Sequence, residues 1–232
     1  GGFGIETNDT GEMQFYISIN GSYHHPAGYI NLGEDIHFVG TYDGQTIKCY
    51  INGVLQEEEP CIGSITFPSN EAAQYMSIGA DSSSDGTGEA YHKGTVATTN
   101  VYSTVFDASM VSALYGKYKI SQADIAAAEV PAPDVLSVEF KEDGSAVDAV
   151  SGTVLEALGT PAVEFSEQYD RYIGVFDGAS NYKFNEFKNF YEKIAQSVTF
   201  EVVLKYDEYT GSYVNSVSNM QSGGFGIETN DT

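Results

Sequence analysis

The first ten residues of the chain, GGFGIETNDT, recur unchanged as residues 223–232, at an offset of 222 residues. Identity over ten positions is not a chance match, and self-identity at a fixed offset is typical of repeat architectures. The segment reads as a strand followed by a turn, because Phe3 and Ile5 alternate with small or polar residues before Asn8-Asp9-Thr10-Gly11. Each end of the chain is therefore predicted to hold the same part of a folding unit.

The β pattern is interrupted once, at residues 120–134, where a helix-like stretch leads into Val130-Pro-Ala-Pro-Asp134. X-Pro steps favour extended backbone, so this segment is predicted to be a linker. The parts on either side of it are residues 1–119 and 135–232. Joining residues 131–222 to residues 1–119 gives one continuous domain, with the C-terminal part first in the chain. In that order the duplicated decapeptide is an overlap, left by cutting a tandem repeat, a filament unit or an engineered circular permutant.

Short segments that alternate apolar and polar residues dominate the chain and predict an all-β protein. Residues 12–19 show this most clearly, with Met13, Phe15, Ile17 and Ile19 on one face. Many such strands between Gly, Asn and Asp turns favour a two-sheet antiparallel sandwich. Further strands are predicted at 36–41, 46–51, 62–67, 75–79, 94–102, 135–140, 163–165, 172–176, 182–184 and 198–206, and helices at 107–118, 121–129 and 185–196.

The charge and hydropathy of the chain argue against two classes of partner. A net charge of −23 repels nucleic acid phosphates and anionic membrane surfaces. No apolar run approaches the roughly 20 residues that a bilayer span needs, so membrane insertion is not expected.

Cys49 and Cys61 are the two cysteines of the chain, and both free thiols and a disulfide remain possible. The Asn52-Gly53 turn would place Cys49 opposite Gln56 in a tight hairpin, so the register does not support a direct bridge to Cys61. Two cysteines also lack the ligand count of a structural zinc site. The sequence favours free thiols.

In the rejoined order the sequence resembles bacterial laminin-G-like domains of the concanavalin A-like lectin/glucanase superfamily. The matching motifs are Val175-Phe-Asp-Gly178 with Asn181-Tyr182, Ile36-His-Phe-Val-Gly-Thr-Tyr-Asp-Gly44 with Thr46-Ile-Lys-Cys-Tyr-Ile-Asn-Gly53, and Ile78-Gly-Ala-Asp81 with the helix ending Ala113-Leu114-Tyr115. The resemblance implies an all-β, two-sheet antiparallel jelly roll with one or two short helices. His37 falls where members of the family often carry histidine, and we expect it to pack within its strand.

Catalytic patterns of that superfamily are missing from the sequence. Its glycanases place carboxylates on one strand, near E-x-D-x-x-E, where they act as nucleophile and acid. The segments Glu57-Glu58-Glu59 and Glu139 with Asp143 read instead as solvated arms or turns. No Gly-x-Ser-x-Gly elbow is present either. We therefore predict that the chain is not an enzyme.

The stretch from Asp81 to Glu89 (DSSSDGTGE) is the most metal-like segment, because oxygen-bearing residues at alternate positions before a Gly suit calcium. It departs from an EF-hand, since position 12 of that pattern is His92 rather than Glu. Some relatives hold a structural calcium, and a plain solvated loop is the alternative. The candidate calcium ligands are Asp81, Ser83, Asp85 and Glu89, with Asp177 and Asn181 at a second place.

The segment from Asn20 to Tyr29 (NGSYHHPAGY) is the predicted ligand-binding surface. It combines aromatic rings with amide and hydroxyl groups, which is the usual combination for sugars, although the chain has no Trp. Adjacent His24 and His25 would point to opposite faces of a strand. An ordinary loop is the alternative. The candidate residues are Asn20, Tyr23, His24, His25 and Tyr29.

These patterns favour a non-enzymatic, extracellular structural or adhesive repeat module of a bacterial surface protein or filament. Neighbouring copies would then be its partners, continuing head-to-tail through the duplicated strand, as in quasi-one-dimensional arrays. The alternative is a carbohydrate-binding accessory module of a secreted hydrolase, with glycans as partners.

Overall fold

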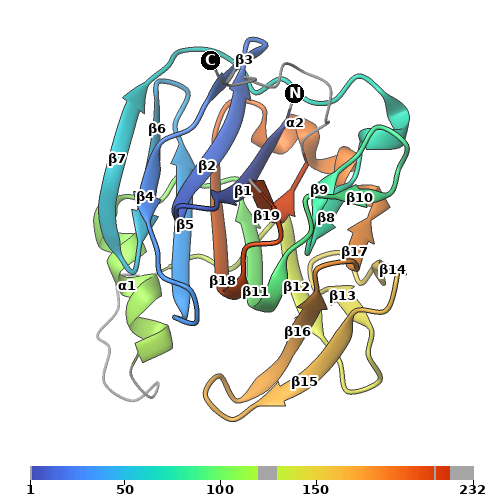
Figure 1. Cartoon of the computed structure of the whole chain (residues 1–232). Helices are drawn as coiled ribbons and strands as arrows, with labels where there is room; N and C mark the ends of the chain where they lie inside the picture. Colours follow the sequence, from blue (N-terminus) through green and yellow to red (C-terminus); the bar gives the residue numbers. More distant parts are fainter. Residues whose placement is uncertain (1, 120–129, 212, 220–232) are drawn as a thin grey trace, which may run out of the picture.

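The computed structural model describes residues 2–119, 130–211 and 213–219. They form two antiparallel sheets packed face to face, with short helices at the edges (Figure 1). The predicted all-β sandwich is confirmed. The segments on either side of the linker both supply strands to both sheets, so they build one sandwich. The permuted order itself remains a prediction.

Strand β1 (Phe3–Asn8) lies inside the eight-stranded sheet, between β19 (Tyr213–Ser218) and β2 (Glu12–Ile19). The described strands run in the order β14-β17-β8-β19-β1-β2-β3, and β4 also pairs with β2. Strand β2 has the predicted bounds. The remaining members are β3 (Ser22–His24), β4 (Ala27–Tyr29), β8 (Met76–Ile78), β14 (Glu156–Leu158) and β17 (Asn181–Phe184).

The nine-stranded sheet runs in the order β13-β12-β11-β18-β5-β6-β7, and β16 joins β15 to β11. Its long central strands are β11 (Lys93–Tyr102) and β18 (Val198–Glu208). A separate pair, β9 (Asp81–Ser82) and β10 (Gly88–Glu89), follows β8. The other members are β5 (Ile36–Tyr42), β6 (Thr46–Ile51), β7 (Val54–Pro60), β12 (Leu136–Phe140), β13 (Ala146–Asp148), β15 (Ala162–Ser166) and β16 (Arg171–Asp177).

Helix α1 (Ala108–Lys119) begins where the sequence predicts. The carboxylate of Asp107 caps it by accepting hydrogen bonds from the backbone N–H of Ser109 and Met110, both at 2.9 Å. The helix predicted at residues 121–129 lies outside the described residues. A further 3-10 turn covers Glu71–Ala73.

Two predicted elements are wrong in detail. The helix predicted over 185–196 is a 3-10 helix, Asn185–Phe190, followed by the single α-turn α2 (Tyr191–Ile194). No side chain caps its start, which removes a common support of an α-helical first turn. Residues 62–67 form no strand: within this segment Ile65 alone makes a β-bridge, to Ile19, and the Asn20 side chain bonds to the backbone of Ile62 and Ser64, which holds the segment as a loop.

Aromatic rings from both sheets meet in the core. Phe3 of β1 packs edge-on against Phe200 of β18, with ring centroids 5.1 Å apart. Phe15 of β2 stacks near the same ring at 6.4 Å. Gly40 on β5 makes room for Phe15, since a Cβ there would lie 2.3 Å from that ring. The approach of the two sheets therefore depends on a glycine.

Cys49 and Cys61 are both free and buried, which confirms the prediction of free thiols and excludes a disulfide between them in this structure. The predicted register around them is off by one residue. Tyr50 pairs with Leu55, but a bulge then places Cys49 opposite Glu57 rather than Gln56. A bulge inserts one extra residue on one strand, and the Asn52-Gly53 turn residues alone do not predict where such a bulge occurs.

Candidate functional site

The side of the eight-stranded sheet that faces away from the core carries polar side chains on its central strands, and several of them, such as Asn215, Ser218 and Asp81, are buried. Phe3 and Ile5 of β1 are fully buried in the core, so Gly4 and Glu6 lie on the opposite side. The Glu6 carboxylate accepts a hydrogen bond from Asn215 Nδ2 of β19 at 3.0 Å. We call this surface the polar face; it comprises Gly4, Glu6, Gln14, Tyr16, Tyr23, His25, Asp81, Asn215 and Ser218.

Asp81 reaches the polar face from β9. Its carboxylate accepts hydrogen bonds from the Ser218 hydroxyl and from the Ser82 N–H, the latter at 2.7 Å. Ser218 lies opposite Gly4 in the β1–β19 pair, so this contact brings Asp81 to β1. Two carboxyl groups separated by 75 positions in sequence, Glu6 and Asp81, thus share one surface.

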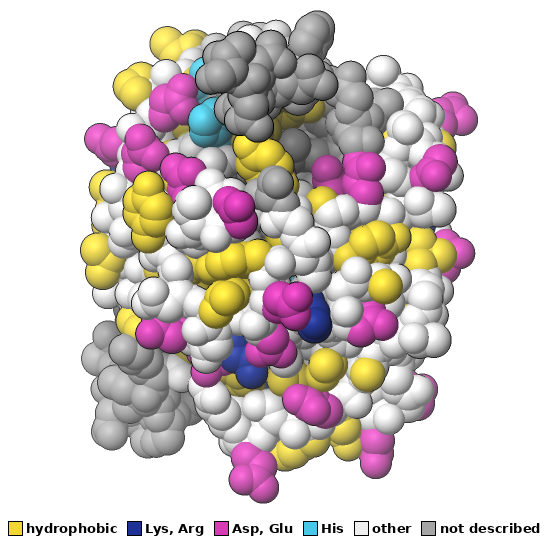
Figure 2. Space-filling model, viewed as in Figure 1, with side chains coloured by type: hydrophobic (Ala, Val, Ile, Leu, Met, Phe, Trp, Pro, Cys, Tyr) yellow, Lys and Arg dark blue, Asp and Glu magenta, His cyan; other side chains and the backbone are white. Residues whose placement is uncertain are grey.

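Burial perturbs both of these carboxyl groups. It raises the pKa of Glu6 to about 7, although the hydrogen bond from Asn215 opposes the shift. It also raises the pKa of Asp81 well above the ordinary value, and the nearby Glu6 charge adds to this. Figure 2 shows that acidic side chains outnumber basic ones on the side of the molecule it draws. Glu6 and Asp81 therefore retain protons where ordinary carboxyl groups have lost them.

Aromatic rings adjoin the carboxyl groups. Tyr16 of β2 lies opposite Gly4, with its ring centroid 5.2 Å from that of Tyr23 and 5.3 Å from that of His25. The His25 ring is nearly parallel to it, at an interplanar angle of 14°. Burial, with a contribution from the Glu6 charge, raises the pKa of Tyr16 to about 12. The rings and carboxyl groups are therefore parts of one surface.

The structure divides the predicted ligand-binding residues. Tyr23 and His25 belong to the polar face, whereas the His24 ring meets Glu59 Oε1 of β7 at 2.7 Å. Asn20 holds the neighbouring loop, because its Oδ1 accepts from the backbone N–H of Ser64 at 3.1 Å. His24 and Asn20 thus make intramolecular contacts away from the rings.

Tyr29 lies at another place on the same sheet and is 73% exposed. It pairs with Glu12, whereas Tyr23 pairs with Ser18, six residues farther along β2. At about 3.4 Å per residue this separates the two tyrosines by roughly 20 Å. Tyr29 is therefore not part of the aromatic cluster.

The predicted calcium ligands mostly support their own turns. Asp85 accepts hydrogen bonds from Ser83 Oγ at 2.5 Å and Thr87 Oγ1 at 2.6 Å, and these lower its pKa to about 2. Asp177 accepts from the Ala179 N–H at 3.0 Å in the same manner. Asn181 donates to Ser77 Oγ at 2.9 Å, and Glu89 pairs with Asp81 across β9 and β10.

Within residues 2–119, 130–211 and 213–219, no group of three or more His, Cys, Asp or Glu side chains could hold a metal ion. The side-chain oxygen atoms of Asp85 and Asp177 accept hydrogen bonds from residues of their own turns, which is the arrangement expected of a plain solvated loop. The calcium site remains a prediction.

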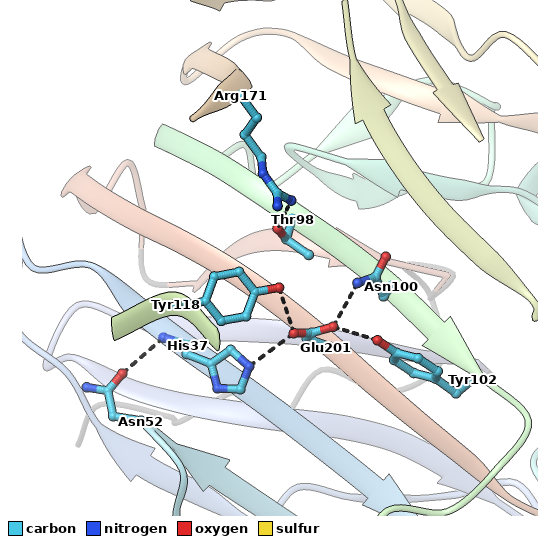
Figure 3. Close-up of polar contacts among 8 residues, drawn as sticks. All are labelled: His37, Asn52, Thr98, Asn100, Tyr102, Tyr118, Arg171 and Glu201. Atoms are coloured by element: carbon cyan, nitrogen blue, oxygen red, sulfur yellow. Dashed lines mark hydrogen bonds and ion pairs between the residues drawn. The ribbon is translucent and has the colours of Figure 1, made fainter. Parts of the chain in front are cut away.

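A second polar cluster lies under α1, on the outward side of the nine-stranded sheet (Figure 3). Glu201 of β18 has no exposed surface, and its Oε1 accepts hydrogen bonds from His37 Nε2 at 3.1 Å and Tyr118 OH at 2.9 Å. Its Oε2 accepts from Asn100 Nδ2 at 2.7 Å and Tyr102 OH at 2.8 Å. As predicted, His37 is buried within its strand.

Burial alone would raise the pKa of Glu201, but the hydrogen bond and charge of His37 with the other donors hold it below the ordinary value. Every oxygen lone pair that points into the protein finds a donor, and no solvent reaches the carboxylate. We interpret this cluster as structural: it fastens α1 to β5, β11 and β18.

A pocket of about 500 Å³ opens elsewhere on the nine-stranded sheet, beside Phe165, Arg171 and Tyr172. Arg171 at its edge donates to Thr98 Oγ1 at 3.2 Å. This pocket combines the exposed Phe165 ring with two cations, Lys141 and Arg171, so it is the alternative place for a ligand.

Sequence reasoning missed Glu6 and Glu201, and it named Asp81 only as a candidate calcium ligand. The signal for Glu201 was a charge between the apolar residues Phe200 and Val202 in the first half of β18, because a buried charge needs hydrogen-bonding partners. Alternation also places Glu6 opposite the core face of β1. The local sequence does not indicate that Asp81 lies near Glu6. Asp81 reaches β1 through its hydrogen bond with Ser218, which pairs with Gly4 of that strand.

Residues 1–112 match the laminin-G-type family model described as the concanavalin A-like lectin/glucanases superfamily. No curated protein and no solved structure shows significant similarity to the chain. None of the described helices is long and apolar enough to cross a membrane. The family match supports a lectin-like or adhesive module in general. Residues 1–112, just under half of the 232-residue chain, are thus similar to the concanavalin A-like lectin/glucanases superfamily, and the two-sheet sandwich agrees with that similarity.

Proposed function

We propose that the chain is a lectin-like module that binds a glycan on its polar face. The observation that carries this proposal is the contiguity of the Tyr16–Tyr23–His25 rings with the Glu6–Asn215 hydrogen bond. An aromatic ring can cover the apolar face of a sugar, while amide and carboxyl groups exchange hydrogen bonds with its hydroxyls.

The protonation of the carboxyl groups suits hydroxyl recognition. A protonated carboxyl group offers an O–H donor as well as acceptor oxygens, whereas a carboxylate only accepts. Burial raises the pKa of Glu6 to about 7 and that of Asp81 well above its ordinary value, so the site holds donors and acceptors together near neutral pH. A sugar hydroxyl, which also donates and accepts, can therefore be satisfied at either group.

We propose binding without hydrolysis. A glycosidase pair needs one carboxyl group ionised while the other is protonated. Burial favours the protonated form of both Glu6 and Asp81, so in mildly acidic solution neither group supplies the carboxylate that such a pair needs. Turnover of a glycan by the protein, lost in Asp81→Asn, would contradict this part of the proposal.

A glycan array followed by titration tests the site. We expect a glycan to bind, and Tyr16→Ala to weaken that binding by at least tenfold. Glu6→Gln, made together with Glu228→Gln at the same position of the second decapeptide, should weaken it to a lesser degree. Phe165→Ala is the matched control, since it removes an exposed ring, 51% accessible, from the other sheet. Loss of binding in Phe165→Ala alone would place the ligand in the pocket of the nine-stranded sheet instead.

A second candidate function is a structural or adhesive repeat, displayed outside a bacterial cell and continued head-to-tail. It is favoured by the identical decapeptides at an offset of 222 residues and by the central place of β1. Light scattering tests it: assembly that grows with concentration is expected, and a monomer at every concentration would count against it.

The predicted calcium site remains a further proposal, at Asp81 to Glu89. Calcium that binds the folded state alone would raise the thermal midpoint, and Asp85→Asn would remove that rise. An unchanged midpoint in excess calcium would refute it.

A further inference from the structure

Strand β11 has two different neighbours along one of its edges. Val96 is the last residue that pairs with β16, opposite Gly174, and Asn100 is the first that pairs with β12. Within the part of the chain that the structure describes, the three residues between them have no strand partner on this edge, although β18 continues along the other edge. Strands β12 and β16 therefore diverge here, and we call the space between them the β12–β16 cleft.

This cleft is the pocket of about 500 Å³, whose lining comes from β11, β12, β15 and β16. Ala97 of β11 and Val138 and Phe140 of β12 are buried and form its floor. Gly174 of β16 leaves room for the Phe140 ring, since a Cβ there would lie 2.7 Å from that ring. Clefts of roughly 300 to 1,000 Å³ with an apolar lining bind small organic ligands. The β12–β16 cleft therefore has the size and the floor of a ligand site.

One wall of the cleft is aromatic. Phe165 of β15 pairs with Tyr172 of β16, and the two rings meet edge to face with centroids 5.4 Å apart. The Phe165 side chain is half exposed beside the pocket. An exposed aromatic ring can cover the flat face of another ring and remove apolar surface of both from water. This wall therefore favours a ligand that contains a ring.

The charged side chains of the cleft balance one another. Glu139, Lys141, Asp170 and Arg171 line it, so two acidic and two basic groups sum to zero in a chain of net charge −23. Lys141 Nζ is paired with Glu139 Oε2 at 2.5 Å. Charges farther away than about 8 to 10 Å are largely screened by salt. An anion in this cleft is therefore not repelled by a local excess of carboxylates.

Arg171 is the cation of the cleft that a ligand can use, and it is the one arginine of the chain. Its Nη1 donates to a neutral oxygen, Thr98 Oγ1, at 3.2 Å. No ion pair joins it to a carboxylate of any described residue. A guanidinium carries five N–H donors in a planar fork that fits the two oxygens of a carboxylate. The contact with Thr98 uses one of these donors and leaves the fork able to bind such an anion.

We propose that the β12–β16 cleft binds a small monocarboxylate that is carried on an apolar ring. The Arg171 fork holds the carboxylate through two parallel hydrogen bonds. The Phe165 ring and the floor of Val138 and Phe140 cover the ring of the ligand. A neutral glycan lacks the charge that Arg171 recognises, so this site is separate from the polar face and does not depend on glycan binding there.

Isothermal titration calorimetry of the full chain with benzoate tests the proposal. Benzamide is the matched probe, because it keeps the ring and the planar head group but carries no charge. We expect benzoate to bind at least tenfold more tightly than benzamide. Equal affinities for the two probes, or no binding of benzoate at millimolar concentration, would overturn the proposal.

Substitution of the exposed Arg171 locates the binding site. Arg171→Gln should abolish the preference for benzoate, and Arg171→Lys should keep only part of it, because an ammonium group lacks the planar fork. Lys205→Gln is the matched control, since it removes a cation of the same sheet that pairs with Asp207 and does not line the cleft. We expect the control to bind benzoate as wild type does, and all three variants to keep the wild-type thermal midpoint. A preference that survives in Arg171→Gln would overturn the assignment of this cleft.

Glucuronate tests the apolar nature of the ligand. It also carries a carboxylate on a six-membered ring, but its hydroxyl groups would lie against Val138 and Phe140, whose side chains offer no hydrogen bonds. We therefore expect glucuronate to bind at least tenfold more weakly than benzoate. Glucuronate binding as tight as that of benzoate would overturn the apolar ring and would identify the ligand as an acidic sugar.

Discussion

Replacing Glu201 by glutamine is the sharpest test of how the nine-stranded sheet holds α1. The fully buried carboxylate accepts four hydrogen bonds, from His37, Asn100, Tyr102 and Tyr118. Glutamine keeps the shape, but one oxygen becomes an NH2 group that faces donors. The perturbation therefore changes charge and hydrogen-bond polarity with little change in volume.

The magnitude follows from the four contacts. A hydrogen bond to an ionised group contributes roughly 1 kcal/mol more than a neutral one, so Glu201→Gln is expected to lower the free energy of unfolding by about 3 to 4 kcal/mol. For a chain of this size that corresponds to a fall of about 10 °C in the thermal midpoint. Glu139→Gln is the matched control, because Glu139 is 53% exposed and pairs with Lys141 at the surface.

Urea denaturation at several pH values is the assay. The pKa of Glu201 is lowered in the folded state, so its ionised form stabilises the fold above the ordinary carboxyl pKa, and that contribution is lost as the pH falls. The stability difference between wild type and variant should therefore be full at neutral pH and shrink in acid. A variant as stable as wild type at neutral pH would refute this account of the cluster.

Three further predictions concern the core and the polar face. Burial raises the pKa of Glu6 to about 7, so the protein should lose roughly 3 kcal/mol of stability as the pH rises through that value and the group ionises. Changing Glu6 and its counterpart Glu228 to glutamine should remove this loss. Denaturation at pH 5 and 8 checks this, and an unchanged pH profile would contradict it. Gly40→Ala should cost about 1 to 3 kcal/mol by overpacking, since its Cβ would lie 2.3 Å from the Phe15 ring; an unshifted urea midpoint would be evidence against that contact. Cys49 and Cys61 should resist a thiol reagent until unfolding, because burial raises the pKa of both thiols; unfolding without reductant should then release two reactive thiols, whereas a disulfide would release none.

The strands that could be predicted carry their signal locally. Strand β2 alternates without interruption, and β6 ends at the Asn52-Gly53 turn, so periodicity and turn chemistry were sufficient for both. The bulge beside Cys49 was not predictable, because it depends on how β7 twists against β6. At residues 62–67 the apolar residues suggested a strand, yet contacts from Asn20 hold that segment as a loop.

The candidate site shows the same limit. Tyr23 and His25 were predicted from composition, because rings and polar groups occur together within a few residues. Their partner Tyr16 and Glu6 were not predicted, and Asp81 was predicted only as a calcium ligand, since sheet pairing brings these side chains from other strands. The link between Glu6 and Asp81 passes through Ser218, far from both in sequence. Long-range register decides such a site, and local patterns do not encode it.

Hydrogen exchange with and without the best glycan from the array tests the central claim most directly, because it reports where the ligand lies. We expect the glycan to slow amide exchange in β1, β2 and β19, whose residues carry the polar face, and to leave β15 and β16 unchanged. Protection confined to β15 and β16, or to no segment at a saturating concentration, would contradict the assignment of the polar face as the glycan-binding site.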